Sequence, residues 1–321
     1  MANQNSSFIR RFFSFIGKIF KTIRTVIGII FTGFLLLVIA GIFADQLPPM
    51  PEKGALYLAP SGILVDQKSY VYPIDTLLAD QSMSEPETLV RDIIDAIDAA
   101  AFDDRISHLI ITTDYLEAAG IAKLDEISHA LSNFSKTEKP IYAVADNFNQ
   151  SQYFLAAHAD HILLNPMGSV LITGFGYYGN YFADALKKLK VKVNVFRAGE
   201  YKSAAEPFIR NNMSPEAREE TADVINLLWR GYTTRIESLR QLDAGAINNL
   251  ANNLDSKLQA TNGDTALLAL REGLVDQLAT RSEIHSFLNQ HIPTNFDGEY
   301  NYVDMEVYLA HLARERSEYI Q

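Results

Sequence analysis

The sequence predicts an α/β protein, a mainly parallel sheet covered by helices, with one transmembrane helix ahead of it. The chain has 321 residues, of which 48% are hydrophobic and 21% charged, so it can bury a substantial core. From residue 55 onward, short apolar runs alternate with segments of helical periodicity. An uncharged apolar stretch precedes Asp45, the first acidic residue of the chain. These three observations define the predicted fold class.

The apolar stretch covers residues 26–44, and its nineteen residues are long enough to cross the hydrocarbon core of a bilayer. We therefore predict a transmembrane anchor over residues 25–44. A cleaved signal peptide ending near Ala44 is the alternative. The length of the apolar run, and the 24 residues before it, favour an uncleaved anchor.

The segment before the anchor, residues 1–24, contains five basic residues and no acid. The positive-inside rule therefore places it in the cytoplasm and the chain beyond Asp45 outside the cytoplasm. Its apolar residues recur at near-helical spacing, which predicts an amphipathic helix in contact with membrane lipid. Residues 45–54 contain three prolines and form the predicted linker to the folded domain.

Composition excludes several classes of function. The net charge is −11 and the basic residues cluster before the anchor, so the body is acidic and nucleic acid is excluded as a partner. The chain has no cysteine, which excludes disulfides and thiolate metal sites. His158 and His161 have only Asp160 as a close carboxylate, so we expect no metal site.

The predicted domain, residues 55–290, begins with an apolar strand that is interrupted at residues 60–62. Ser84 and Glu87 form a capping-box pattern, which predicts a helix start. The next predicted elements are strand 106–112, helix 118–134, strand 140–145, helix 150–159, strands 162–164 and 170–172, helix 177–189, strand 191–196, helix 215–242, a short helix within 263–276 and helix 281–290. This alternation predicts parallel strands. Residues 291–321 are predicted to be a connector.

One segment has the residue types of a catalytic site. Residues 196–208 leave a predicted strand, turn at Gly199 and place Lys202 among small residues. A lysine is a general base only when neutral, and burial away from carboxylates favours the neutral form. A solvated lysine at a helix start is the alternative. Ser203 is excluded as its partner, because adjacent residues on a helix do not face each other.

Residues 197–208 read Arg-Ala-Gly-Glu-Tyr-Lys-Ser-Ala-Ala-Glu-Pro-Phe, and Asn-Met-Ser-Pro follows at 212–215. Together they resemble the general-base motif of the long, two-domain signal peptide peptidase A family, peptidase family S49. The stretches 104–106, 139–144, 152–156, 263–266 and 273–276 agree with that family in order and spacing. The resemblance covers nearly the whole chain. It implies a crotonase-like sheet-and-helix spiral shared with Clp proteases, with Lys202 as the base of a serine/lysine dyad and no cofactor.

The same resemblance implies that the nucleophile lies elsewhere. In this family the serine belongs to the second domain, in an Ala-Ser-Gly-Gly setting, and the matching stretch here, residues 147–153, has Gln150 in the place of the serine. Ser151 is displaced by one residue and lacks the glycines whose amides help to form an oxyanion hole. The serine then comes from a continuation of the chain or from another polypeptide.

The expected function is therefore the amino-terminal, lysine-supplying half of a membrane-bound serine endopeptidase that degrades cleaved signal peptides and other apolar peptides. This half is expected to be inactive alone. The family also implies a homo-oligomer at the bacterial inner membrane, with the domain on the periplasmic or extracytoplasmic side. A non-catalytic, membrane-tethered scaffold is one alternative. A dinucleotide-binding enzyme is another, because residues 174–179 read G-x-G-x-x-G, although Arg197 rather than an acid ends the next predicted strand.

Overall fold

The computed structural model describes residues 18, 21–38, 47–70, 86–196, 198, 199 and 202–320. The chain divides into two units, Met1–Pro49 and Met50–Gln321. In the first unit, Lys21–Val38 form the one helix of the described residues that is long and apolar enough to cross a membrane, with a mean hydropathy of 1.8. A signal sequence near the amino terminus would meet the same criteria of length and hydropathy. Most of the predicted basic amphipathic segment lies outside the described residues.

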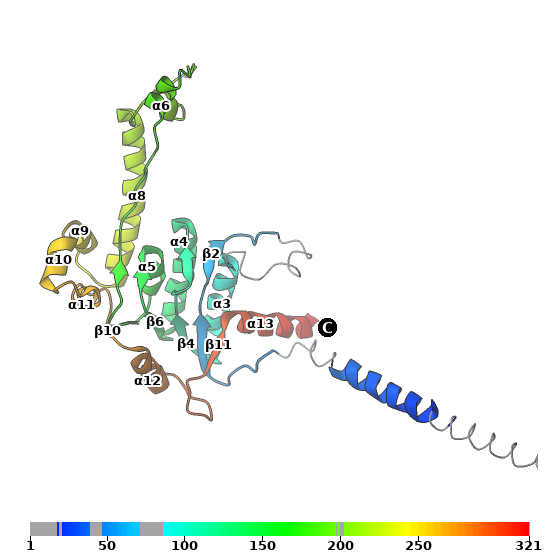
Figure 1. Cartoon of the computed structure of the whole chain (residues 1–321). Coiled ribbons are helices and arrows are strands. Elements are labelled where there is room, and N and C mark those ends of the chain that lie inside the picture. The colour runs from blue at the N-terminus through cyan, green and yellow to red at the C-terminus, as the bar shows by residue number, and fades with distance from the viewer. Residues whose placement is uncertain are drawn as a thin grey trace, which may run out of the picture. The chain divides into compact units, whose positions relative to one another are not determined.

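The second unit is built on a parallel sheet of six strands in the order β10-β8-β6-β4-β1-β11 (Figure 1). These strands are β1 (Gly54–Leu58), β4 (Ile106–Ile111), β6 (Ile141–Ala145), β8 (His161–Leu164), β10 (Gln277–Leu278) and β11 (Tyr302–Asp304). The central strands are mostly apolar because both faces of the sheet are covered. The predicted α/β fold class is confirmed.

Helices cover both faces of this sheet. Leu56, Leu109 and Ala143 point to one face, where they share a core with α3, α4, α5, α11 and α13. Ile110 and Tyr142 point to the other face and pack against α12. The bounds of these helices are α3 (Val90–Phe102), α4 (Ile121–Phe134), α5 (Gln150–Ala156), α11 (Thr265–Arg271), α12 (Arg281–His291) and α13 (Met305–Ile320).

Two smaller parallel sheets accompany the main one, with the orders β3-β2-β5 and β7-β9. Their strands are β2 (Gly62–Val65), β3 (Glu87–Leu89), β5 (Leu116–Ala118), β7 (Phe148–Asn149) and β9 (Val170–Leu171). The remaining short elements are η1 (Ser135–Thr137), α9 (Ala246–Asn252) and α10 (Leu254–Ala260). Because β7 pairs with β9 and α5 follows β7 directly, the start of α5 lies next to both strands.

The helix start predicted from Ser84 and Glu87 is wrong. Glu87 belongs to β3, and α3 begins only at Val90 without a side-chain cap. The Glu87 carboxylate instead accepts hydrogen bonds from the backbone N and the Oγ of Ser69, at 2.7 and 2.6 Å. The competing bond with Ser69 explains why the acidic residue does not act as a helix cap. Ser84 lies outside the described residues.

A long arm, residues 173–239, leaves the body after β9 and returns through α8 (Pro215–Leu239) (Figure 1). Its outgoing leg, residues 173–182, leads to a distal end that contains α6 (Ala183–Lys188) and α7 (Glu206–Ile209). The start of α8 follows the predicted pattern, because Ser214 Oγ accepts from Ala217 N at 3.2 Å and Pro215 follows it.

Two predicted elements of the arm differ from the structure. The helix predicted over 177–189 is shortened to α6, and residues 191–196 do not form the predicted strand. Valines alternate with polar residues there, but Val191 and Val193 are 51% and 37% exposed. A strand requires a neighbouring strand to pair with, and the arm has left the sheets behind.

Residues 291–321, which the sequence assigned to a connector, contribute to the domain. β11 pairs with β1, with Leu56 opposite Val303. In α13, Tyr308 is fully buried and its hydroxyl donates to Asp103 Oδ2 at 3.1 Å. The folded domain therefore continues to residue 320.

A buried histidine links α4 to the end of α5. His158 Nε2 lies 2.8 Å from Ser128 Oγ, and both side chains are buried. Burial, helped by the charge of Arg235, lowers the pKa of His158 from its ordinary 6.5 to about 4. Between these values the unfolded chain binds more protons than the folded chain, so stability decreases as the pH falls through this window.

We expect His158 to lower the free energy of unfolding by about 2 kcal/mol between pH 6.5 and 5. A His158→Gln variant, which stays neutral and can still bond Ser128, should lack this part of the pH dependence. Urea denaturation of both proteins at pH 6.5, 5.5 and 5.0 measures the difference. Equal slopes of stability against pH in the two proteins would show that His158 is not a buried neutral residue.

Candidate active site

The expected position of the nucleophile is the start of α5. Asn149 caps this helix, because its Oδ1 accepts from the backbone N of Ser151 and of Gln152, both at 2.9 Å. Gln152 Oε1 in turn accepts from Asn149 N at 2.7 Å, which completes a capping box. The amides of Ser151 and Gln152 are therefore already bonded within the chain. An oxyanion at this helix end would have to displace the Asn149 side chain.

Gln150, in the place that the resemblance gives to the serine, is also bonded internally. Its Oε1 accepts from the backbone N of Thr173 at 3.1 Å and of Gly174 at 2.7 Å. Among the described residues, the hydroxyl of the neighbouring Ser151 makes no hydrogen bond to a lysine or histidine side chain that could take its proton. This part of the chain has a strand end followed by a helix start, and the side-chain oxygen of its first helical residue, Gln150, is already bonded.

Lys202 lies between α6 and α7, at the distal end of the arm. Two hydrogen bonds close this end, from Phe182 N to Pro207 O at 2.6 Å and from Asp184 N to Asn211 Oδ1 at 3.2 Å. The Lys202 side chain is exposed, so the burial expected of a neutral lysine is not provided by the described residues. Arg197, Glu200 and Tyr201 of the motif lie outside the described residues.

The structure separates the two candidate positions. The start of α5 lies beside the sheets, whereas α6 lies at the end of α8 that is remote from them (Figure 1). The arm therefore carries Lys202 away from Gln150 and Ser151. Among the described residues, Ser151 and Lys202 therefore do not form a serine/lysine pair.

Glu206, the second of the two acidic residues of the motif, has a structural role that the sequence analysis did not predict. It is only 1% exposed, and its Oε2 accepts from Ser214 N at 3.0 Å. Ser214 also caps α8, so this bond ties α7 to the start of the long helix. The signal was present in the sequence as a carboxylate eight residues before a Ser-Pro helix start. The second half of the motif thus fixes the distal end of the arm on which Lys202 lies.

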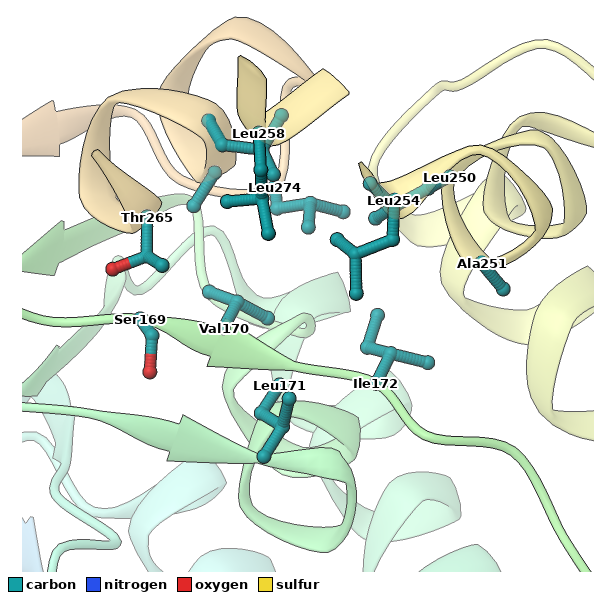
Figure 2. A pocket seen from close by; sticks show the side chains of 12 residues that line it. Ser169, Val170, Leu171, Ile172, Leu250, Ala251, Leu254, Leu258, Thr265 and Leu274 are labelled. Carbon is teal, nitrogen blue, oxygen red and sulfur yellow. The ribbon is translucent and has the colours of Figure 1, made fainter. Parts of the chain in front are cut away.

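An apolar pocket opens beside β9, between that strand and α9, α10 and α11. Its cavity volume is about 80 Å³. Figure 2 shows Ile172, Leu254 and Leu274 directed into this space, with Ser169 and Thr265 at one side. Thr265 Oγ1 donates to Gly168 O at 2.7 Å, so its hydroxyl is already bonded. A pocket of this size and character fits one aliphatic side chain.

A polar depression lies at the carboxyl ends of β1, β4 and β6, and its two aspartates bond to neighbouring loops. Asp114 Oδ1 accepts from Asp146 N at 3.0 Å, and burial raises the pKa of Asp114. Asp146 binds Asn165 Nδ2 at 2.9 Å and pairs with Arg281, which lowers the pKa of Asp146. Both carboxylates therefore hold loops together.

The residues of the two competing motifs have other contacts and neighbours. The predicted glycine fingerprint at residues 174–179 is not followed by a helix, since α6 begins only at Ala183, and phosphate binding requires the helix start next to the glycines. His158 is bonded to Ser128, whereas His161 stacks on Phe287 and contacts Gln277. Among the described residues, no three His, Asp or Glu side chains are grouped as metal ligands.

Comparisons with known proteins identify the family of the chain. The profile of peptidase family S49 matches residues 133–291. The chain is 34% identical over 298 residues to Protease 4 of Haemophilus influenzae, which covers 89% of this chain and 48% of that protein. It is 34% identical over 291 residues to Protease 4 of Salmonella typhi, with 88% and 47% covered. The chain therefore spans about half the length of these curated relatives. A solved membrane-bound stomatin-specific protease is similar at 14% identity with a TM-score of 0.35, covering 79% of this chain and 94% of that one.

Proposed function

The chain belongs to peptidase family S49, and we propose that it is the amino-terminal half of a membrane-bound serine endopeptidase whose active site is shared between two domains. In this proposal Lys202 is the general base and a second domain supplies the serine. One observation carries it. Lys202 lies on a projecting arm, and Gln150, which the resemblance puts in the position of the nucleophile, has an internally bonded side chain.

The proposed mechanism assigns two proton transfers to Lys202. The neutral amine takes the proton of the serine hydroxyl as the serine oxygen attacks the peptide carbonyl, and the resulting ammonium protonates the leaving amine. Water then hydrolyses the acyl-enzyme with the lysine again as base. Because Lys202 is exposed in this chain, the second domain must cover it to favour the neutral form. No metal or organic cofactor takes part.

The arm has the surface that such a partner requires. Large apolar side chains are exposed along it: Tyr177, Tyr178, Leu189, Val191, Phe196 and Leu227. Tyr178 and Phe196 are 95% and 98% exposed, which is unusual for aromatic residues that face water. We propose that the second domain packs on the arm, and that the complete proteins assemble into a homo-oligomer.

The proposed substrates are extended apolar peptides, including cleaved signal peptides. The pocket beside β9 is lined by aliphatic side chains, and β9 pairs with β7 on one edge only. An extended peptide can add its backbone to a strand edge and place alternate side chains in such a pocket. Leucine-rich segments of signal peptides have side chains of the matching size.

The proposal is tested by mixing the two halves. This chain and a separately expressed second domain, with its Ala-Ser-Gly-Gly stretch, should together hydrolyse an apolar peptide that neither half hydrolyses alone. A non-catalytic scaffold, the second candidate that the missing serine permits, predicts no gain on mixing. A second domain without its serine is the matched control.

We further propose that the helix Lys21–Val38 is an uncleaved anchor in a bacterial inner membrane, with the amino terminus in the cytoplasm and the domain outside it. A protease added to intact spheroplasts should then digest the chain beyond Asp45, because that part faces the added enzyme. A cytoplasmic marker protein must stay intact in the same sample. Protection of the whole domain until the inner membrane is opened would contradict this topology.

A further inference from the structure

Gln150 lies where both legs of the arm meet the body. It is the first residue of α5 and directly follows β7. Its side-chain Oε1 binds the backbone N of Thr173 and of Gly174, which begin the outgoing leg. Its backbone carbonyl accepts a hydrogen bond of 3.1 Å from Tyr232 Oη, on the returning helix α8. One residue thus joins the body to the outgoing and the returning leg.

The outgoing leg needs this support. β9 ends at Leu171, so Thr173 and Gly174 lie past the ladder to β7, and Gln150 supplies the acceptor for their amides. Gly174 has φ +81°, a backbone conformation that glycine adopts readily and that makes the leg turn here. A serine side chain is two atoms shorter than glutamine and does not reach both amides. Residue 150 can therefore either bond the outgoing leg, as glutamine, or act as a nucleophile, as serine, but not both.

Aromatic rings surround the same joint. The ring of Tyr232 stacks on that of Phe154 of α5, with 5.5 Å between the ring centroids. Phe175 of the outgoing leg contacts Tyr232 edge-on, with 6.3 Å between the centroids. Phe175 also lies edge-on to Trp229 at 6.4 Å. Apolar packing holds the legs together but is not directional, whereas hydrogen bonds depend on angle. The three bonds of Gln150 therefore contribute to the direction in which the arm leaves the body, together with the ion pair at 3.2 Å between Arg235 on α8 and Asp125 on α4.

We infer that Gln150 is a positioning residue that sets the orientation of the arm and, through it, the placement of Lys202; the inference rests on the proposed role of Lys202 as base. α8 has 25 residues, which gives it a length of about 37 Å. The part of α8 from Tyr232 at the joint to Pro215 is about 26 Å long, so a rotation of about 7° at the joint displaces its distal end by about 3 Å. Misplacing a catalytic group by about 1 Å lowers a rate on the order of 100-fold.

Arm orientation can be measured without any assay of activity. Because the chain has no cysteine, Lys188→Cys on α6 and Asp98→Cys on α3, both exposed positions, give two unique sites for spin labels. Pulsed electron paramagnetic resonance on the full chain in detergent micelles then reports the distribution of distances between arm and body. Spin-diluted samples remove contributions between copies.

Three substitutions of Gln150 distinguish the effect of its acceptor oxygen from the effect of its side-chain length. Gln150→Met keeps the length and removes the acceptor, and Gln150→Asn is a second variant that keeps the amide but is too short. Both should shift or widen the distance distribution by about 3 Å or more. Gln150→Glu keeps an acceptor oxygen and should restore the original distribution. Gln259→Met, at an exposed glutamine on α10, is the matched control and should change nothing.

Turnover by the complete two-domain protein provides the functional measurement. Gln150→Met should lower kcat about 10- to 100-fold with KM within about twofold, and Gln150→Glu should recover kcat. An unchanged distance distribution in both Gln150→Met and Gln150→Asn would overturn the inference, as would a displaced arm with normal kcat. A Lys202→Ala variant that retains turnover would instead overturn the proposed function, and the distance result would stand independently of it.

Discussion

Replacing Lys202 by alanine in the complete two-domain protein should lower peptidase turnover by about a thousandfold or more without unfolding the protein. The loss follows from the absence of another group to take the serine proton. Stability should be preserved, because the side chain is exposed and the distal end of the arm is held by other residues, among them Glu206 and Ser214. The kcat/KM for a fluorogenic apolar peptide and the circular dichroism spectrum measure the two expectations.

Neighbouring lysines provide matched controls for this experiment. Lys188 and Lys192 are exposed at the same end of the arm, and changing either to alanine removes a positive charge without removing the proposed base. Both variants should keep turnover within about twofold. Lys202→Arg should be as inactive as Lys202→Ala, because a guanidinium does not lose its proton near neutral pH. Near-normal turnover by folded Lys202→Ala would remove this residue from the mechanism.

The parallel sheet was predictable because its strands are buried on both faces. Ile141–Ala145 is therefore a continuous apolar run and Ile106–Ile111 is apolar apart from Ser107 and His108, so both strands stand out in the sequence. β11 was missed because it has three residues, of which only Val303 is buried, so it leaves no pattern. Residues 191–196 show the opposite case, since their alternation predicts a strand that has no partner in the second unit.

The candidate site was predictable in its residues but not in its contacts. The motif around Lys202 and the glutamine in the serine's place are both visible in the sequence. The capping box of Asn149 and Gln152 also has a recognisable N-x-x-Q spacing. By contrast, the bonds from Gln150 to Thr173 and Gly174 join residues 23 and 24 positions apart, and only the fold brings them together.

The second large effect concerns this chain alone, which should have no peptidase activity. In the proposed mechanism Lys202 accepts a proton, but the resemblance puts Gln150 in the serine's place, and the Gln150 side-chain oxygen accepts from Thr173 N and Gly174 N. Ser151 lies at a helix end whose first amides are bonded by Asn149. Lys202 and Ser203 precede α7 and do not lie on a helix, so the exclusion of Ser203 by helix geometry is wrong and the labelling experiment tests this serine directly. A base without a nucleophile leaves the peptide bond intact.

The most direct measurement treats the purified 321-residue chain with a fluorophosphonate probe and an apolar peptide substrate. The expected result is neither covalent labelling nor turnover, with both appearing when the serine-bearing second domain is added and the label found on that domain. The contradicting result is labelling of the isolated chain at Ser151 or Ser203, together with turnover that disappears when the labelled serine is changed to alanine.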